Sequence, residues 1–245
     1  MTTPYFDAPL PRVFAHRGLA TTAPENTSAA FAAALVAGAD YLETDAHVTA
    51  DGIAVLVGGR TIEIAAATGA QLDALDLGDG EAVPRLLAVL VAFPEARFNI
   101  DVKTRAAVGA VADAVRSAGA IDRVLVTSFD GGTRSDILAA LPGVASSASS
   151  DLVARAVLPA RLGLVGVVRR ILAGVPCVQV PERHRGVAVV TPRSLRTFHA
   201  AGIEVHVWTV NDPADMTRLV ARGVDGIVTD RCDLAVATLR PGSRS

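Results

Sequence analysis

Short apolar runs alternate along the chain with longer segments of helical length. The short runs predict β-strands. They cover residues 12–16, 41–48, 54–57, 97–103, 123–129, 144–149, 177–181, 204–210 and 226–230. The longer segments predict helices, and the clearest cover residues 27–37 (behind a cap at Asn26), 84–92, 105–118, 130–141, 193–201 and 212–222.

One connection is too short for this alternation. Only "TADGI" separates the runs 41–48 and 54–57, whereas a parallel crossover needs about a dozen residues. These two runs therefore predict an antiparallel hairpin, with the turn at Asp51-Gly52. Its return strand brings the residues near position 58 back to the level of Glu43 and Asp45.

Eight runs remain once the return strand is set aside, and they can all be parallel. Eight parallel strands with intervening helices predict a (β/α)8 TIM barrel, here with a small hairpin insertion after strand 2. The alternative is a doubly wound open sheet, but no GxGxxG follows the first strand. With no repeat, linker or low-complexity tract, residues 1–245 are expected to form a single domain.

Residues 151–174 are apolar with interspersed arginines, which leaves two interpretations open. An interfacial helix would touch lipid with its apolar face. A barrel helix broken near Pro159 and Gly163 would simply pack on the sheet, and this second interpretation is favoured.

Composition narrows the functional class. Apolar residues make up 51% of the chain, enough for a large core, and the formal net charge is −2. Neither this charge nor the 4% of aromatic residues suits a nucleic-acid partner. Cys177 and Cys232 are isolated in the sequence, so they predict no disulfide framework or zinc site. The absence of a secretory pattern and of an 18-residue apolar run predicts a cytoplasmic protein without stable membrane insertion.

Candidate catalytic and metal-binding residues are sought at the carboxyl ends of the predicted strands, because the active sites of such barrels lie there. Glu43 and Asp45 share a strand face, and Asp101 and Lys103 repeat this spacing on another strand. Three carboxylates in one barrel mouth repel each other, and oxygen ligands favour Mg²⁺ or Ca²⁺. The alternative is that they are only ion-paired with Arg17 and Lys103.

His16 and Arg17 follow the first strand and suggest phosphate chemistry. Arginine binds phosphoryl oxygens in a bidentate manner, and a histidine can transfer a proton. A core histidine is the simpler explanation for His16 alone, but the neighbouring Arg17-Gly18 at a strand end favours a functional role. A barrel isomerase or aldolase with Lys103 as an amine is disfavoured, because flanking carboxylates would keep the amine protonated.

Several motifs, in order, make the chain resemble the glycerophosphodiester phosphodiesterase family. They are "AHRG", "PENTSAAFAAALVAGADYLETDAHVTADGIAVL", "FNIDVK", "VLVTSF", "VHVWTVNDP" and "GVDGIVTD", together spanning roughly residues 12–232. The resemblance implies a TIM barrel with a small insertion after the second strand. It also implies a small-molecule substrate, a glycerophosphodiester that is hydrolysed to sn-glycerol 3-phosphate and an alcohol.

The resemblance also assigns roles to individual residues. It makes His16 one of two catalytic histidines, Arg17 a phosphate ligand, and Glu43 and Asp45 ligands of the divalent cation. It makes Asp101, where the family has glutamate, the third metal ligand, and Lys103 a phosphate contact. Glu25 and Asn26 would brace the site, and Trp208 would form a wall of the substrate site.

The chain departs from the family on the return strand of the hairpin. The family's "VVxHD" histidine and aspartate fall on Gly58 and Gly59, and a nearby family arginine falls on Ile64. We therefore expect reduced or altered activity, with Gly58 leaving open space beside the substrate. The alternative is a catalytically impaired relative that binds a phosphodiester or phosphoglycerol. A less favoured alternative is that His47, on the face of Glu43 and Asp45, replaces the lost histidine.

Overall fold

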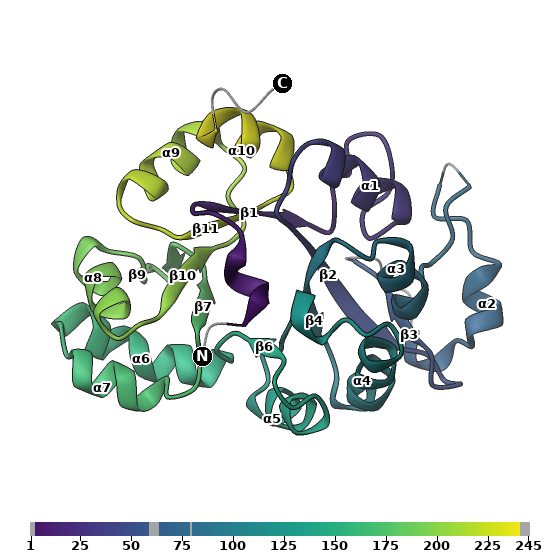
Figure 1. The fold of residues 1–245 in the computed structure, drawn as a ribbon, viewed down its shortest axis with the longest axis horizontal. Coiled ribbons are helices and arrows are strands. Elements are labelled where there is room, and N and C mark those ends of the chain that lie inside the picture. The colour runs from purple at the N-terminus through teal and green to yellow at the C-terminus, as the bar shows by residue number, and fades with distance from the viewer. Residues whose placement is uncertain (1–2, 59–63, 79, 241–245) are drawn as a thin grey trace.

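The computed structural model describes residues 3–58, 64–78 and 80–240. Eight parallel strands form its centre, and the helices surround them (Figure 1). These strands are β1 (Arg12–His16), β2 (Tyr41–Val48), β4 (Arg97–Val102), β5 (Val124–Thr127), β6 (Ala145–Ser146), β7 (Cys177–Val180), β10 (Glu204–Val207) and β11 (Gly226–Thr229).

The strands follow the spatial order β6-β5-β4-β2-β1-β11-β10-β7. A parallel bridge between Ser147 and Cys177 joins the two ends of this order. The sheet therefore closes almost completely into a (β/α)8 barrel, as predicted. Each of the nine predicted runs contains a strand of this sheet, although β6 is only two residues long.

The predicted hairpin is also present. β3 (Ala54–Leu56) pairs antiparallel with β2, and Gly52 adopts the left-handed φ of +81° that the turn requires. Val57 donates a backbone hydrogen bond of 3.1 Å to the carbonyl of Asp45. The return strand thus brings residue 58 back to the level of Glu43 and Asp45 on β2, as expected. Gly59 lies outside the described residues.

Helices occupy the segments between the strands. The α-helices are α1 (Ser28–Val36), α2 (Gly69–Asp73), α3 (Leu86–Ala92), α4 (Val108–Ser117), α5 (Gly131–Ala140), α6 (Ser150–Leu162), α7 (Val165–Ile171), α8 (Pro192–Ala200), α9 (Pro213–Ala221) and α10 (Cys232–Leu239). The short 3-10 helices are η1 (Pro4–Asp7), η2 (Ile64–Ala66), η3 (Arg105–Ala107) and η4 (Ile121–Arg123). A second small hairpin, β8 (Arg183–His184) with β9 (Val187–Ala188), follows β7.

Two details of the predicted helices are wrong. Thr27, not Asn26, caps α1, because its side chain accepts a hydrogen bond from the Ala30 amide. The segment 151–174 does split into two helices, but the break lies at Gly163 alone. Gly163 ends α6 with a left-handed φ of +81°, whereas Pro159 lies inside the helix. Helix α10 was not predicted.

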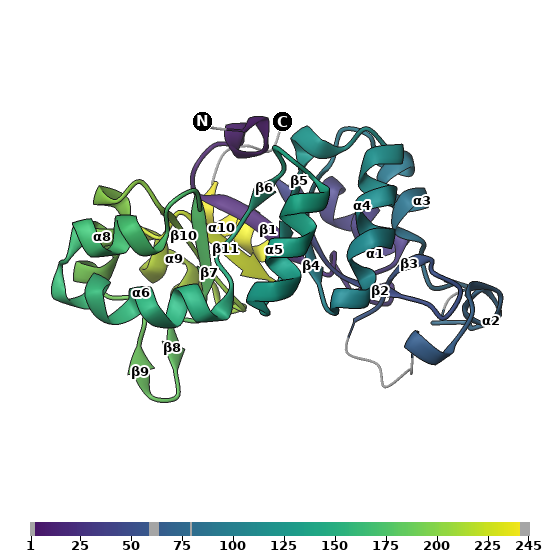
Figure 2. The same cartoon turned by 90° about the horizontal axis from the view of Figure 1, so that it is seen from below.

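The barrel is closed at the amino-terminal ends of its strands. Tyr5 of η1 packs there against inward-facing aromatic residues, with its ring centroid 4.8 Å from that of Tyr41, which stacks on Phe14 at 4.5 Å. The Tyr41 hydroxyl donates a 2.7 Å hydrogen bond to the Tyr5 carbonyl. Seen from the side, η1 lies opposite the β8–β9 hairpin (Figure 2). Aromatic side chains therefore fill this end of the barrel.

Within the described ranges, no helix has both the length and the apolar character needed to cross a membrane.

A substitution at Gly18, directly after β1, tests how tightly the loop that carries the site packs against α1. Its φ is +84°, and an added Cβ would lie 2.7 Å from the backbone carbon of Ala30. Gly52 has a similar φ but open space around it. We expect Gly52→Ala to lower the free energy of unfolding by about 1 kcal/mol through backbone strain. Gly18→Ala should cost at least about twice as much, because a clash adds to the strain.

Urea denaturation of the two variants measures this difference. Equal losses of stability would show that the loop after β1 can move away from α1.

Candidate active site

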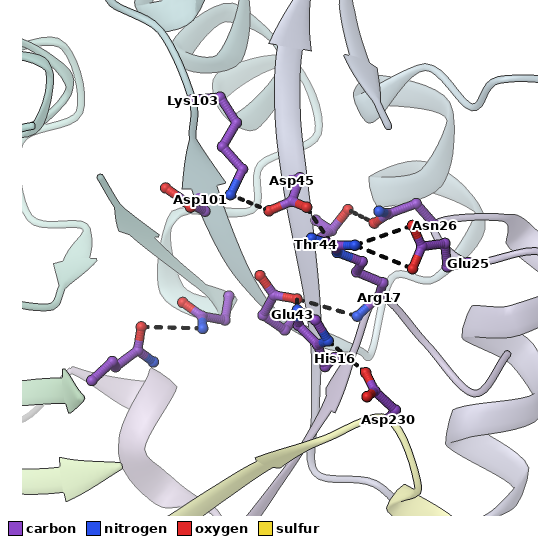
Figure 3. A network of polar contacts seen from close by, with 12 residues as sticks. His16, Arg17, Glu25, Asn26, Glu43, Thr44, Asp45, Asp101, Lys103 and Asp230 are labelled. Carbon is purple, nitrogen blue, oxygen red and sulfur yellow. Dashed lines mark hydrogen bonds and ion pairs between the residues drawn. The ribbon is translucent and has the colours of Figure 1, made fainter. Parts of the chain in front are cut away.

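His16 ends β1 and is held between two acidic residues (Figure 3). Its Nδ1 lies 2.6 Å from Asp230 Oδ1, and its Nε2 lies 3.8 Å from Glu43 Oε2. Burial alone would lower the pKa of His16, but the hydrogen bond with Asp230 and the charge of Glu43 outweigh burial and raise it. Asp230 thus fixes the ring, and the Nε2 edge is directed toward the acidic cluster.

Arg17 bends the chain into the site with a left-handed φ of +56°. Its backbone N–H donates to the Glu43 carboxylate at 3.1 Å. Its guanidinium donates from Nη1 to both oxygens of Glu25, at 3.1 and 3.2 Å, and its Nε lies 2.9 Å from Asp45 Oδ2. Such a left-handed non-glycine residue is uncommon and often marks a functional site.

The three predicted metal ligands lie on the adjacent strands β2 and β4. Asp45 of β2 pairs with Asp101 of β4, and Glu43 lies in register with His16. Lys103 bridges two of these acids, with Nζ 2.5 Å from Asp45 Oδ1 and 2.5 Å from Asp101 Oδ2. Burial lowers the pKa of Lys103, but the two carboxylates outweigh this effect and raise it. Lys103 therefore stays protonated, which argues against an amine nucleophile.

Glu43 is the least compensated of these acids. Burial, followed by the charge of Asp45, raises the pKa of Glu43 to about 7. Burial also raises the pKa of Asp101 despite the opposing charge of Lys103. The three carboxylates of the cluster therefore outnumber its two cations, Arg17 and Lys103.

The loop before α1 fills the space beside Gly58. Asn26, with a φ of +58°, is fully buried and accepts a 2.5 Å hydrogen bond from the Thr44 hydroxyl. A Cβ built on Gly58 would lie 2.7 Å from Asn26 Nδ2 and closer still to Glu25 Oε1. The prediction of open space at Gly58 is therefore wrong. The Glu25 carboxylate, which accepts hydrogen bonds from Arg17, occupies that space.

Trp208 forms an aromatic wall with Phe129, which the sequence analysis did not single out. The two rings meet edge to face with centroids 6.0 Å apart. Phe129 is 58% exposed, and Lys103 Nζ lies 5.9 Å from its ring centroid. These two rings therefore border the charged cluster through Phe129, whereas the contact of Trp208 with substrate stays a prediction.

Residues 16–234 match the model of the glycerophosphoryl diester phosphodiesterase family. The chain belongs to this family. It is 38% identical over 230 residues to the "Probable glycerophosphodiester phosphodiesterase 2" of Mycobacterium tuberculosis, covering 90% of this chain and 87% of the relative.

Solved structures agree with this assignment. The glycerophosphodiester phosphodiesterase of Agrobacterium tumefaciens superposes with a TM-score of 0.75 at 27% identity, covering 93% of this chain and 98% of that one. An Oleispira antarctica phosphodiesterase, solved with the product sn-glycerol-3-phosphate, shares the fold with a TM-score of 0.78 at 22% identity, covering 94% and 97%.

The resemblance to this phosphodiesterase family implies a divalent cation, and the donor set fits one in part. Among the described residues Asp101 Oδ1 is buried without a hydrogen-bond partner, and burial together with the charge of Asp45 raises the pKa of Glu43 to about 7. As the side chains stand, however, no three His, Cys, Asp or Glu residues of the described chain converge on a metal position. Lys103 lies between Asp45 and Asp101, so an ion held by all three acids requires this ammonium to withdraw.

Two other histidines of the chain, His47 and His206, are less well placed than His16. His47 lies on β2 beyond Asp45, and burial lowers its pKa. His206 is fully buried, its ring centroid lies 4.8 Å from that of Phe14 in the aromatic cluster around Tyr5, and its Nε2 lies 3.2 Å from Glu204 Oε2. His206 is therefore a core residue, whereas the role of His47 stays a prediction.

Two further residues of the site were not assigned a role from the sequence. Asp230 was visible only as a polar residue after the last strand, and nothing in the sequence pairs it with His16, 214 positions away. Asn99 alternates with Asp101 on β4, so its inward direction could have been predicted from strand periodicity.

Asp230 is expected to control the proton affinity of His16. We expect Asp230→Asn to lower the pKa of His16, because the hydrogen bond to a carboxylate is lost while burial, which opposes the charged ring, remains. NMR titration of the histidine rings measures the shift. The matched change Asp233→Asn removes a carboxylate that pairs with Arg231 instead and should have no effect. An unchanged His16 titration in Asp230→Asn would contradict this assignment.

Proposed function

We propose that this chain is a metal-dependent phosphodiesterase that hydrolyses glycerophosphodiesters to sn-glycerol 3-phosphate and an alcohol. The observation that carries the proposal is the convergence of a His16–Asp230 pair, two cations and three acids at one end of a barrel of this family. Phosphoryl transfer needs such a site, because it depends on positioning and on stabilising developing charge.

In this proposal, Arg17 and Lys103 bind the phosphoryl oxygens. Both now pair with Asp45, and Arg17 also pairs with Glu25, so phosphate competes with carboxylates for the same donors. His16 acts at phosphorus as nucleophile or proton-transfer group, oriented by Asp230. A divalent cation on Glu43, Asp45 and Asp101 would neutralise charge on the phosphoryl group.

The proposal includes a reduced rate for poor leaving groups. Gly58 offers no proton donor, and the loss of such a group typically costs about 10²–10⁴-fold. Glu25 occupies the adjacent space, which also favours a second candidate, a relative that binds phosphodiesters with little turnover. We further propose that residues 1–245 act as one catalytic domain. The cytoplasmic location stays a prediction.

Turnover of glycerophosphocholine with Mg²⁺ or Ca²⁺ tests the proposal. We expect release of sn-glycerol 3-phosphate that EDTA abolishes and that His16→Ala lowers by at least about 10²-fold, because the group acting at phosphorus is lost. His199→Ala removes another imidazole–aspartate pair, with Asp225, and should retain activity.

Binding without turnover, detected as a ligand-induced rise in melting temperature, would favour the second candidate. Neither binding nor turnover would contradict both candidates.

Leaving-group dependence tests the missing proton donor. We expect a glycerophosphodiester of 4-nitrophenol to react at least about 10²-fold faster in kcat than glycerophosphocholine, because nitrophenolate leaves without protonation. Steady-state kinetics on both substrates measure the ratio. Similar kcat values would mean that a donor is present. A selective loss of choline release in His47→Ala would then identify it.

A further inference from the structure

Positive charge is concentrated in one part of the chain. Residues 151–200, which form nearly all of α6 together with α7, β7, the β8–β9 hairpin and α8, contain eight arginines but only two acids, Asp151 and Glu182. The segment therefore has a net charge of +6, although the whole chain has a net charge of −2. All eight arginines are exposed, so this charge faces solvent.

These arginines lack acidic partners. Among the residues that the structure describes, none of the eight forms an ion pair with a carboxylate. Exposed arginines elsewhere do pair, as Arg105 does with Asp136 and Arg116 with Asp113. Glu182, one of the two acids of the segment, is itself paired with two arginines of α9. The guanidinium charges of the segment are therefore available to an external anion.

The corner between α6 and α7 also exposes large apolar side chains. The inner face of the two helices joins the barrel core through Ala156, Ala160 and Val168, as the favoured interpretation of this segment predicts. The outer face does not, because four apolar residues there are 40–62% exposed, namely Leu158, Leu162, Leu164 and Val167. Leu158 and Leu162 are one helical turn apart and share a face.

This corner lies on the same side of the barrel as the β8–β9 hairpin (Figure 1, Figure 2). Arg193, at the start of α8, donates from Nη2 to the Leu162 carbonyl at 2.5 Å. The hairpin immediately precedes α8 and extends past α6, away from η1. We call the resulting patch the basic–apolar surface. It comprises Arg161, Leu162 and Leu164 of the corner with Arg183, Arg185 and Val187 of the hairpin, all of them exposed.

Unpaired arginines among exposed leucines match the chemistry of an anionic lipid bilayer. Guanidinium groups bind lipid phosphates, and leucine side chains enter the boundary between headgroups and acyl chains. A nucleic acid would leave the leucines unused, and Phe198, the one aromatic residue among the Phe, Tyr and Trp of the segment, is buried. We propose that the basic–apolar surface docks this chain on an anionic lipid bilayer. The inference goes beyond the proposed function, because this surface contains no residue of the site.

Cosedimentation with vesicles tests the inference without any substrate. We expect the chain to bind vesicles of phosphatidylglycerol and phosphatidylcholine at least about tenfold more tightly than vesicles of phosphatidylcholine alone, because each arginine gains from the anionic surface. Raising the salt to about 0.5 M NaCl should remove most of this difference, because salt screens exposed charges.

Paired variants locate the contact on the chain. Arg161→Gln with Arg185→Gln should weaken binding to the anionic vesicles by about tenfold or more. The matched control, Arg105→Gln with Arg116→Gln, removes the same charge from η3 and α4 and should bind as the unaltered chain does.

The apolar part of the surface is tested in the same way. Leu162→Gln with Leu164→Gln should weaken binding by about tenfold, because apolar area no longer enters the bilayer. Val91→Gln, at a 61% exposed position of α3, is its control and should have no effect. If the leucine variant does not fold, the arginine variant still decides. All of these variants should keep their turnover of soluble glycerophosphocholine, so failure of the proposed function would leave the vesicle result intact.

Several results would overturn the inference. An unaltered chain that ignores anionic vesicles would remove the docking surface, and equal losses in the arginine variant and its control would mean that only net charge matters. Self-association of the unaltered chain without vesicle binding, abolished in the leucine variant, would assign the surface to a second copy of the chain. Binding of duplex DNA or RNA in place of vesicles would assign it to nucleic acid.

Discussion

The site depends on the balance between buried acids and the two cations that face them. Glu43, Asp45 and Asp101 are almost completely buried at the carboxyl-terminal end of the barrel. Lys103 bridges two of them, and Arg17 contacts Asp45 from the other side. Buried carboxylates in this proximity are stable only when they are compensated. Burial and the charge of Asp45 outweigh the nearby cationic groups and raise the pKa of Glu43. A phosphate and a cation entering together would restore the balance.

The side chains inside the barrel differ from its amino-terminal end to the end that carries this cluster. The aromatic residues around Tyr5 fill the amino-terminal end. Above them come the amides of Asn99 and Gln179, and above the amides come the acids with their cations. Above the Arg12–Glu204 ion pair at the strand starts, the side chains thus change from aromatic to amide to charged along the barrel axis.

The region around Gly58 shows how a lost side chain can be structurally accommodated. The hairpin still brings this position to the level of Glu43 and Asp45 on β2, but Glu25 and Asn26 now fill the space in which a side chain would begin. Glu25 in this place holds Arg17, a predicted phosphate ligand. A histidine restored at position 58 would therefore have to displace Glu25 before it could transfer protons.

Local patterns predicted much of the fold. Alternating apolar runs identified all nine strands of the main sheet, and the five-residue connection at 49–53 identified the hairpin. The two-residue spacing of Glu43 with Asp45, and of Asp101 with Lys103, correctly indicated that they share one face. Helix boundaries were predicted less well. Thr27 begins α1 through a side-chain hydrogen bond, and Gly163 ends α6 through a left-handed backbone angle, and a periodic pattern encodes neither feature.

By itself, the sequence determined the barrel, its hairpin and the acids at the strand ends, because strand periodicity and short turns are local properties. Only the tertiary structure decided that Lys103 lies between two acids, that Asp230 holds His16, that Glu25 fills the space at Gly58, and that Asn99 meets Gln179. These contacts join residues far apart in the chain or on different strands. Barrel closure and register set them, and no local spacing contains that information.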